Sequence, residues 1–238
     1  MDFIFMLTHM DRTVDRAQTL LDDLGTSGLQ HIGFKDVGVD RLMIRSIAQT
    51  IRALGAVSYL EIVSLAPDDA IKATEIAIEA GVDRILGGAG VPRMLAAVAG
   101  SKTEIYPFAG RPAGHPTILR GTARQVQDDC RNFREAGCPG VDLLAYRASD
   151  ADPLELTRAA RHGLGEDGWL ICAGGVASPA HVRALAAAGA NAFTVGSAVF
   201  DCNFIAGANS VPEQIEGILA LCADLKTGTA SSAMVAAS

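Results

Sequence analysis

The sequence predicts an α/β protein with a single domain, a (β/α)8 TIM barrel. Short apolar runs alternate with stretches of helical period along the chain, which is typical of parallel strands joined by helical crossovers. Eight strand–helix units can be counted, and this number favours a closed barrel over an open sheet. The 238 residues, 49% of them hydrophobic, are enough to bury one large core.

Each expected strand is a short apolar run that ends in small or polar residues. The expected strands cover residues 2–8, 31–36, 56–64, 84–88, 104–110, 141–147, 169–175 and 192–197. The segments between them repeat apolar residues at helical spacing. The expected helices lie near residues 13–24, 39–54, 67–80, 91–99, 122–136, 153–163, 178–188 and 212–226.

Two helix starts carry a capping residue followed by proline, at Asp152-Pro153 and Ser178-Pro179. A capping side chain accepts hydrogen bonds from the free amides of the first turn, and proline is tolerated at the first helical position. The last twelve residues show no apolar periodicity. We therefore expect the barrel to span residues 1–226 and residues 227–238 to form a mobile C-terminal tail.

The formal net charge of -7 limits the expected partners, because an acidic surface repels nucleic acid and anionic lipid. The five cysteines are odd in number and show no C-x-x-C spacing, which favours reduced thiols in a cytoplasmic protein. No apolar run is long enough to cross a bilayer, and the N-terminus lacks a signal-peptide pattern. Small barrels often associate, so a homo-oligomer is expected.

The last two predicted strands both end in small residues, Gly174-Gly175 and Gly196-Ser197. The loops after the strands of a barrel converge at one end, where exposed backbone N–H groups can bind a phosphate without a lysine. We therefore expect Gly174, Gly175, Gly196 and Ser197 to bind a phosphate group of the substrate.

Lys35 is the main candidate for catalysis. The other three lysines of the chain lie on helix or loop patterns, where solvated lysines are common. Lys35 instead lies at the end of an apolar strand, two positions after Gly33, which leaves space beneath it inside a barrel. Removal of its ammonium from water should lower the pKa, which suits a general base or a Schiff-base nucleophile. The alternative is a lysine at the rim that extends into solvent.

Glu61 is the expected partner of Lys35. It interrupts an otherwise apolar strand, where an unpaired carboxylate is costly. Neighbouring parallel strands lie about 4.8 Å apart, so the two side chains can meet inside the barrel. Such a pair could transfer a proton during catalysis, or it could be a structural ion pair.

Arg111, His115 and Arg147 are candidates for binding the substrate. Arg111 and His115 lie on a loop that two prolines stiffen, and Arg147 follows the sixth strand. A guanidinium suits a carboxylate or a phosphate, although a rigid rim loop or a subunit contact would also explain the loop. No H-E-x-x-H or H-x-H spacing is present, so neither a metal nor another cofactor is predicted.

Residues 170–201 resemble the second half of the ribulose-phosphate-binding barrels, a TIM-barrel superfamily of isomerases, epimerases, decarboxylases and aldolases. The resemblance rests on A-G-G-V at 173–176, A-A-G-A at 187–190 and V-G-S-A at 195–198. It implies a phosphate held by the glycine-containing loops named above. The sequence lacks the D-x-K-x-x-D motif of the decarboxylases, and it has Arg147 where the aldolases place a Schiff-base lysine. No single reaction is therefore implied.

The expected function is that of an enzyme acting on a small phosphorylated metabolite, such as a sugar phosphate or a keto acid phosphate. A carbon–carbon lyase that uses Lys35, similar to an aldolase or a decarboxylase, is the first hypothesis. A sugar-phosphate isomerase or epimerase that shuttles a proton through Lys35 and Glu61 is the second. A barrel that binds a phosphorylated ligand without catalysis is the third, since fold does not determine function.

Overall fold

The computed structural model describes residues 1–25, 27–114 and 116–236, with side chains as far as Thr227. The strands of its main sheet are β1 (Asp2–Met6), β4 (His31–Lys35), β5 (Val57–Ile62), β6 (Arg84–Gly87), β7 (Glu104–Tyr106), β10 (Gly140–Leu143), β11 (Trp169–Cys172) and β12 (Ala192–Val195). They are paired in parallel in the order β10-β11-β12-β1-β4-β5-β6-β7.

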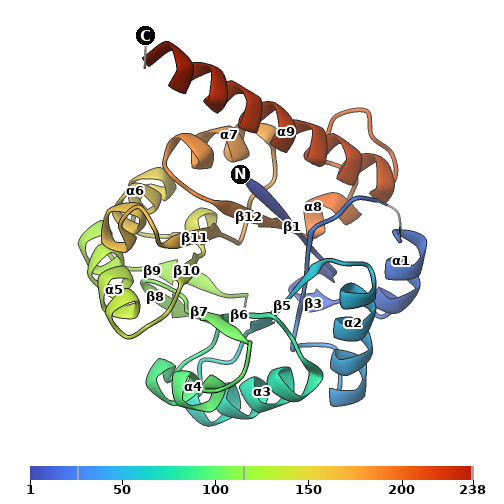
Figure 1. The fold of residues 1–238 in the computed structure, drawn as a ribbon, viewed down its shortest axis with the longest axis vertical. Coiled ribbons are helices and arrows are strands. Elements are labelled where there is room, and N and C mark those ends of the chain that lie inside the picture. Colours follow the sequence, from blue (N-terminus) through green and yellow to red (C-terminus); the bar gives the residue numbers. More distant parts are fainter. Residues whose placement is uncertain (26, 115, 237–238) are drawn as a thin grey trace.

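The two edges of this sheet meet each other. Asp142 of β10 bridges Phe108, which follows β7, and its backbone amide donates a hydrogen bond to the Pro107 carbonyl at 2.9 Å. The strands therefore form a ring with helices around it, as Figure 1 shows. The predicted (β/α)8 TIM barrel is confirmed, and each expected strand is present.

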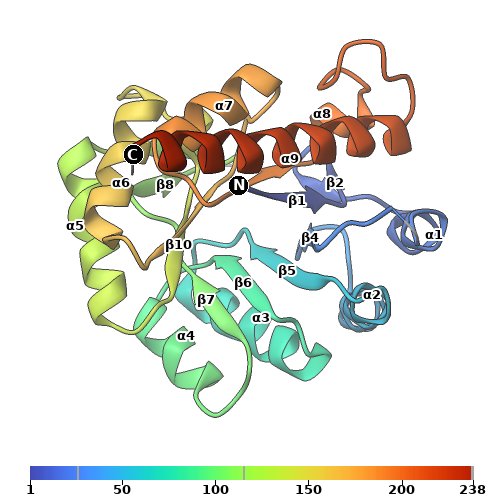
Figure 2. The same cartoon turned by 45° about the horizontal axis from the view of Figure 1, so that its top comes forward.

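Helices connect the strands on the outside of the ring. They are α1 (Ala17–Asp23), α2 (Arg41–Ala53), α3 (Pro67–Ala80), α4 (Val91–Val98), α5 (Ala123–Glu135), α6 (Pro153–Leu164), α7 (Pro179–Ala187), the short α8 (Ser197–Phe200) and α9 (Val211–Ala236). The last of these lies beside α7, α8 and the start of β1 (Figure 2). Among the described residues, none of the helices is long and apolar enough to span a membrane.

α9 is longer than the sequence predicts, because it continues past residue 226 to Ala236. Extension of an existing helix adds one backbone hydrogen bond per residue and needs no new nucleus, so a segment rich in Ala and Ser can remain helical without an apolar stripe. The boundary of the barrel domain at residue 226 stays a prediction.

The two predicted capping residues are confirmed. The Asp152 carboxylate accepts hydrogen bonds from the amides of Leu154 and Glu155, and the Ser178 hydroxyl accepts one from the amide of His181.

We expect Asp152→Ala to lower the free energy of unfolding by about 1 kcal/mol, because two amides of α6 lose their acceptor. Urea denaturation measures this change. Asp167→Ala, at an exposed position, is the control and should have almost no effect; equal effects of both variants would contradict the capping role.

Two antiparallel hairpins that the sequence did not reveal lie in the loops after β1 and β7. The first joins β2 (Thr8–His9) to β3 (Arg12–Thr13), and the second joins β8 (Arg111–Ala113) to β9 (Ile118–Arg120). Both follow the carboxyl ends of barrel strands, where the active sites of such barrels lie. They therefore place residues at the mouth that strand counting alone could not assign.

Side chains fill the inside of the barrel. Its centre is an apolar cluster of Ile4, Met6, Tyr59, Leu86, Tyr106, Ile171 and Ala192. At the amino ends of the strands, the Arg84 guanidinium lies 5.5 Å from the ring centroids of both Tyr59 and Tyr106. Charged side chains gather again at the carboxyl ends, above the apolar cluster, where Lys35 and Glu61 are buried.

Candidate functional site

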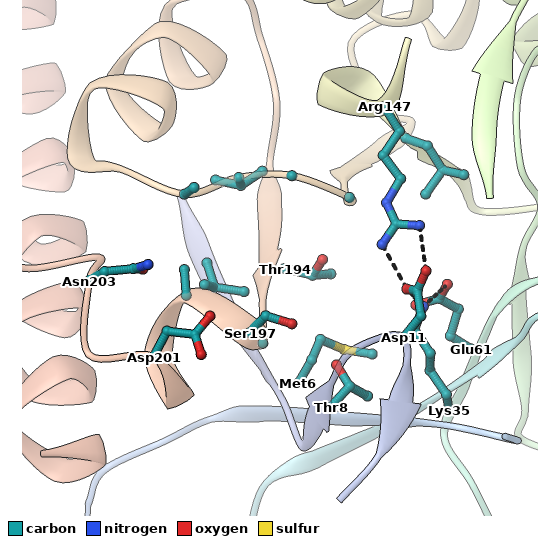
Figure 3. A pocket seen from close by; sticks show the side chains of 18 residues that line it. Met6, Thr8, Asp11, Lys35, Glu61, Arg147, Thr194, Ser197, Asp201 and Asn203 are labelled. Atoms are coloured by element: carbon teal, nitrogen blue, oxygen red, sulfur yellow. Dashed lines mark hydrogen bonds and ion pairs between the residues drawn. The ribbon is translucent and has the colours of Figure 1, made fainter. Parts of the chain in front are cut away.

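A cavity of about 260 Å³ opens at the carboxyl ends of the barrel strands. Side chains from β4, β5 and the β2–β3 hairpin line one side of it, and the loops after β11 and β12 line the other. Figure 3 shows a charged group on one side and Ser197 on the other. The glycine-containing loops and Lys35, both predicted from the sequence, therefore face one common space.

Lys35 and Glu61 form an ion pair inside the barrel. They are direct neighbours in the register of β4 and β5, and the Lys35 Nζ lies 3.1 Å from the Glu61 Oε1. Only 8% of the Lys35 side chain and 9% of the Glu61 side chain are exposed. The adjacency that the strand positions predict is thus present, and Met6 packs against Gly33 beneath the pair.

Asp11 is the closest partner of Lys35, and the sequence analysis missed it. Its Oδ1 accepts a hydrogen bond from the Lys35 Nζ at 2.7 Å, and its side chain is 9% exposed. Asp11 lies in the two-residue turn of the β2–β3 hairpin, next to Met10. The φ angles of Met10 and Asp11 are 48° and 62°, a region that residues other than glycine seldom adopt.

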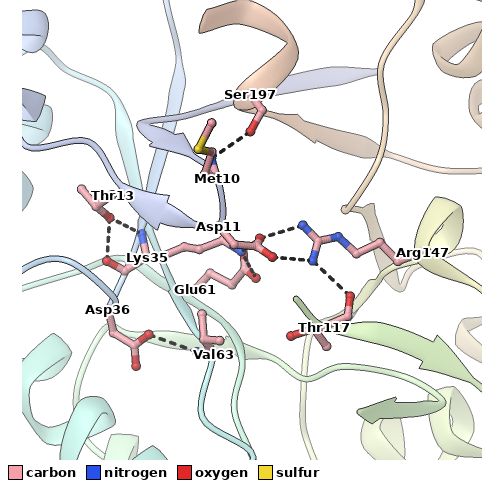
Figure 4. Close-up of polar contacts among 10 residues, drawn as sticks. All are labelled: Met10, Asp11, Thr13, Lys35, Asp36, Glu61, Val63, Thr117, Arg147 and Ser197. Carbon is pink, nitrogen blue, oxygen red and sulfur yellow. Dashed lines mark hydrogen bonds and ion pairs between the residues drawn. The ribbon is translucent and has the colours of Figure 1, made fainter. Parts of the chain in front are cut away.

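Arg147 joins the same cluster from the opposite wall. It ends the 3-10 turn η1 (Ala145–Arg147) after β10, and its two terminal nitrogens donate to the two Asp11 carboxylate oxygens at 2.7 and 2.9 Å. A further bond, at 3.0 Å, reaches the Thr117 carbonyl. Figure 4 shows Asp11 between Lys35 and Arg147. The predicted position of Arg147 at the mouth agrees with this placement, but its guanidinium binds a carboxylate of the chain itself.

The charges in this cluster decide the protonation of Lys35. Burial alone lowers the pKa of the Lys35 ammonium, but the charges of Glu61 and Asp11 outweigh burial and raise that pKa above its usual value. The sequence analysis predicted a lowered pKa for Lys35. This prediction is wrong, because it considered burial of the ammonium and did not include the second carboxylate, Asp11. For Asp11, burial raises the pKa, and the hydrogen bonds from Arg147 and Lys35 reverse the effect and hold that pKa well below its usual range. Lys35 is therefore held as an ammonium at neutral pH.

Asp142 is a second residue that sequence analysis missed. It lies on β10 with no exposed surface, and neither carboxylate oxygen has a hydrogen-bond partner among the described residues. Burial raises its pKa well above the usual value, and the negative charge of Glu61 adds to this shift. The signal that could have found it is the one that identified Glu61, a carboxylate in an apolar strand.

The two glycine-containing loops bring their backbone close to neighbouring side chains. Gly174 and Gly175 have φ angles of 70° and 83°. A Cβ atom at Gly174 would lie 2.8 Å from the Arg147 Cδ, and one at Gly196 would lie 2.5 Å from the Thr8 Oγ1. Larger residues are thus excluded at these positions, and the backbone of both loops borders the cavity.

The structure separates Arg111 from this cavity. The Arg111 guanidinium pairs with Asp129 at 2.8 Å, and its side chain is 58% exposed at the start of the β8–β9 hairpin. Arg111 is not among the residues that line the cavity. His115 lies outside the described residues.

No group of three or more His, Cys, Asp or Glu side chains in the described ranges has an arrangement that could hold a metal ion. The sequence does contain one H-x-D spacing, His9-Met10-Asp11, which could have drawn attention to Asp11. The two side chains of this triplet diverge, since the His9 Nε2 lies 2.9 Å from the Asp201 Oδ1 and Asp11 points to Lys35.

Two solved structures are similar to this chain over most of its length. One is a cube-shaped, highly porous protein cage designed by fusing symmetric oligomeric domains, with a TM-score of 0.68 and 14% identity over 100% of this chain and 77% of that one. The other is orotidine 5'-phosphate decarboxylase from Pyrococcus horikoshii OT3, with a TM-score of 0.65 and 15% identity over 90% of this chain and 96% of that one. No protein-family model and no curated protein sequence matches the chain. At these identities, the similarities show that the chain shares the TIM-barrel fold.

Proposed function

We propose that the protein is an enzyme that acts on a small phosphorylated metabolite and breaks a carbon–carbon bond with the help of Lys35. The observation that carries this proposal is the shared cavity, in which a buried ammonium faces two loops with exposed backbone amides. Similarity to a decarboxylase of a phosphorylated substrate supports the same reaction class.

The phosphate would lie on the loops after β11 and β12. Among the described residues, the amides of Gly175, Val176, Ser197 and Ala198 have no hydrogen-bond partner, and all four residues line the cavity. Backbone amides that converge on one point bind a phosphate without a cationic side chain. This arrangement leaves Lys35 and Arg147 for other parts of the substrate.

The raised pKa of Lys35 determines what it can contribute. A Schiff base requires a neutral amine, whereas Lys35 is held as an ammonium by Glu61 and Asp11. In the proposed step, the carbon–carbon bond breaks, its electron pair stays on the substrate carbon, and that carbon takes a proton from Lys35. Water then returns a proton to Lys35. With carbon dioxide as the leaving fragment, the reaction is a decarboxylation.

A second candidate is an isomerase or epimerase. The distance of 3.1 Å between the Lys35 Nζ and the Glu61 Oε1 favours it, because a carboxylate base and an ammonium acid in contact can remove and return a proton. A non-catalytic phosphate-binding barrel is the third, and it predicts that Lys35→Ala leaves the affinity for a phosphorylated ligand intact.

A thermal-shift screen of inorganic phosphate, glycerol 3-phosphate, sugar phosphates and keto acid phosphates tests the ligand class. A ligand at 100 times its dissociation constant should stabilise the folded protein by about 2.7 kcal/mol. The same compounds without phosphate are the controls. If no phosphorylated compound stabilises the protein more than its unphosphorylated counterpart, the proposed function is wrong.

Borohydride reduction in the presence of a substrate that the enzyme converts distinguishes two lyase mechanisms, proton donation by Lys35 and formation of a Schiff base on Lys35. We expect no covalent adduct on Lys35, because its ammonium form does not attack a carbonyl. Mass spectrometry of the tryptic peptide that contains Lys35 detects such an adduct. A reduced adduct on Lys35 would contradict the role of proton donor and would restore the Schiff-base hypothesis.

The oligomeric state belongs to the same proposal. The designed cage that resembles this chain is built from symmetric oligomeric domains, and most soluble oligomers are assemblies of one chain. Light scattering would give the mass in solution, with a multiple of the 24.7 kDa chain expected.

A further inference from the structure

We propose that Lys35 and Arg147 form a carboxylate subsite for the ligand, and that Asp11 is an internal occupant which the ligand's carboxylate displaces. This inference rests on the proposed function in one respect, since it takes the phosphate of the ligand to lie on the loops after β11 and β12. It specifies the ligand as a small compound that carries both a phosphate and a carboxylate.

The geometry of the two cations is that of a carboxylate receptor. The Arg147 nitrogens bind the two Asp11 oxygens in parallel, at 2.7 and 2.9 Å, and the Lys35 Nζ adds a third bond of 2.7 Å to the Oδ1. A planar guanidinium binds a carboxylate in this way with high specificity. Nothing in these contacts depends on the aspartate backbone, so a ligand carboxylate can make the same bonds.

The two cations are fixed, whereas the residue between them lies on a weakly held turn. Lys35 is part of β4, and Arg147 ends the 3-10 turn η1 that follows β10. The turn at Met10 and Asp11 has two positive φ angles, and the Met10 side chain is 80% exposed. The turn contacts the loop after β12 through a single hydrogen bond of 3.3 Å, which the Met10 amide donates to the Ser197 Oγ.

The base of the same hairpin is held firmly. The Thr13 Oγ1 donates to the Lys35 carbonyl at 2.7 Å and accepts from the Lys35 amide at 2.8 Å. Movement would therefore be confined to the turn at Met10 and Asp11, which precedes Thr13. Glu61 cannot leave in the same way, because it belongs to the central strand β5.

Charge balance requires that Asp11 leave when a carboxylate enters. Two cations, Lys35 and Arg147, face two ionised carboxylates, Asp11 and Glu61. The neighbouring Asp142 carboxyl is not counted among the anions, because burial raises its pKa well above the usual value. A third carboxylate would add an uncompensated charge to a largely buried group, whereas exchange for Asp11 keeps the balance. Displacement also enlarges a cavity of about 260 Å³, which is small for a ligand with two anionic groups.

Chemical rescue of Asp11→Gly with acetate tests the subsite. Glycine accepts a positive φ, so this variant removes the carboxylate without adding backbone strain. At pH 7 and equal ionic strength, replacement of chloride by acetate should raise its melting temperature by about 3 °C. Wild type and Asp15→Ala, which removes an exposed carboxylate of the same segment, should not respond. Asp11→Gly with Arg147→Gln should not respond either.

Binding of two phosphorylated probes tests displacement. Relative to wild type, Asp11→Gly should bind 2-phosphoglycolate about tenfold more tightly, while its affinity for glycerol 3-phosphate, which has no carboxylate, stays the same. Asp11→Asn, which keeps the size of the side chain and tolerates the turn, should change the ratio of the two affinities in the same direction.

The outcomes distinguish this inference from the proposed function. If acetate stabilises Asp11→Gly no more than chloride does, or stabilises the double variant equally, the carboxylate subsite is wrong. An unchanged ratio of the two probe affinities in both Asp11 variants would also overturn it. If neither phosphorylated probe binds wild type or any variant while acetate rescue succeeds, the phosphate site is wrong and the carboxylate subsite stands.

Discussion

Lys35→Met is expected to lower the free energy of unfolding by about 3–5 kcal/mol at pH 7 and to abolish turnover. Lys35 is the sole ion-pair partner of the Glu61 carboxylate among the described residues, and only 9% of the Glu61 side chain is exposed. Removal of the ammonium leaves that charge buried without compensation. Asp11 keeps its bidentate bond to Arg147, so most of the loss arises at Glu61. Urea denaturation followed by fluorescence of the single tryptophan measures this loss.

The pH dependence of this deficit follows from the raised pKa of Lys35. A lysine whose pKa is higher in the folded than in the unfolded protein stabilises the fold at pH values below about 10.5, and this contribution disappears as the pH rises through the folded value. Wild type loses this contribution at alkaline pH, and Lys35→Met has none to lose. The difference in free energy of unfolding between the two proteins should therefore narrow as the pH rises above about 10.5.

Two further variants identify the cause. Lys72→Met removes a lysine that is 73% exposed and lies 3.6 Å from Asp69, and it should change stability by less than about 0.5 kcal/mol. The double variant Lys35→Met with Glu61→Leu should regain most of the lost free energy of unfolding, because two apolar side chains replace the buried Lys35–Glu61 ion pair. If the double variant is no more stable than Lys35→Met alone, the uncompensated carboxylate is not the cause.

The fold could be predicted because its signals are local. Each barrel strand is an apolar run of a few residues, and helix starts such as Asp152-Pro153 carry their own capping residue. Lys35 and Glu61 could be paired for a similar reason. Each is a charged residue in an apolar strand, and the strands are neighbours, so the register alone brings them together.

Asp11 could not be found in this way, because its role depends on a contact across 136 residues of sequence. Its hairpin consists of two-residue strands and a turn without glycine, so neither strand periodicity nor turn composition indicates it. The error in the pKa of Lys35 has the same origin. The strand positions place one carboxylate, Glu61, beside the lysine, and the second, Asp11, comes from the β2–β3 hairpin.

Arg111 illustrates the opposite case. Its proline-containing loop does lie after β7, as predicted, but the loop folds into the β8–β9 hairpin. This hairpin directs the guanidinium to Asp129 on α5. Sequence position therefore predicted the neighbourhood of the residue and not the direction of its side chain.

Asp142→Asn is expected to become more stable than wild type as the pH rises. The Asp142 carboxyl is fully buried without a hydrogen-bond partner among the described residues, and burial, together with the charge of Glu61, raises its pKa above 3.8. A carboxyl group with a raised pKa contributes its full stability below the unfolded pKa and loses it as the pH rises toward the folded pKa. Asparagine has a similar size and does not ionise, so the variant does not share this loss.

The stability difference between Asp142→Asn and wild type should therefore grow by at most about 1.4 kcal/mol per pH unit above pH 4, and level off beyond the folded pKa of Asp142. Urea denaturation of both proteins from pH 4 to 9 gives this curve, and Asp167→Asn, at an exposed position, should follow wild type throughout. If the stability difference between Asp142→Asn and wild type does not change with pH, Asp142 ionises in the folded protein with its ordinary pKa. Three buried carboxylates would then face Lys35 and Arg147, and the balance of two cations and two anions that makes Asp11 exchangeable for a ligand carboxylate would not hold.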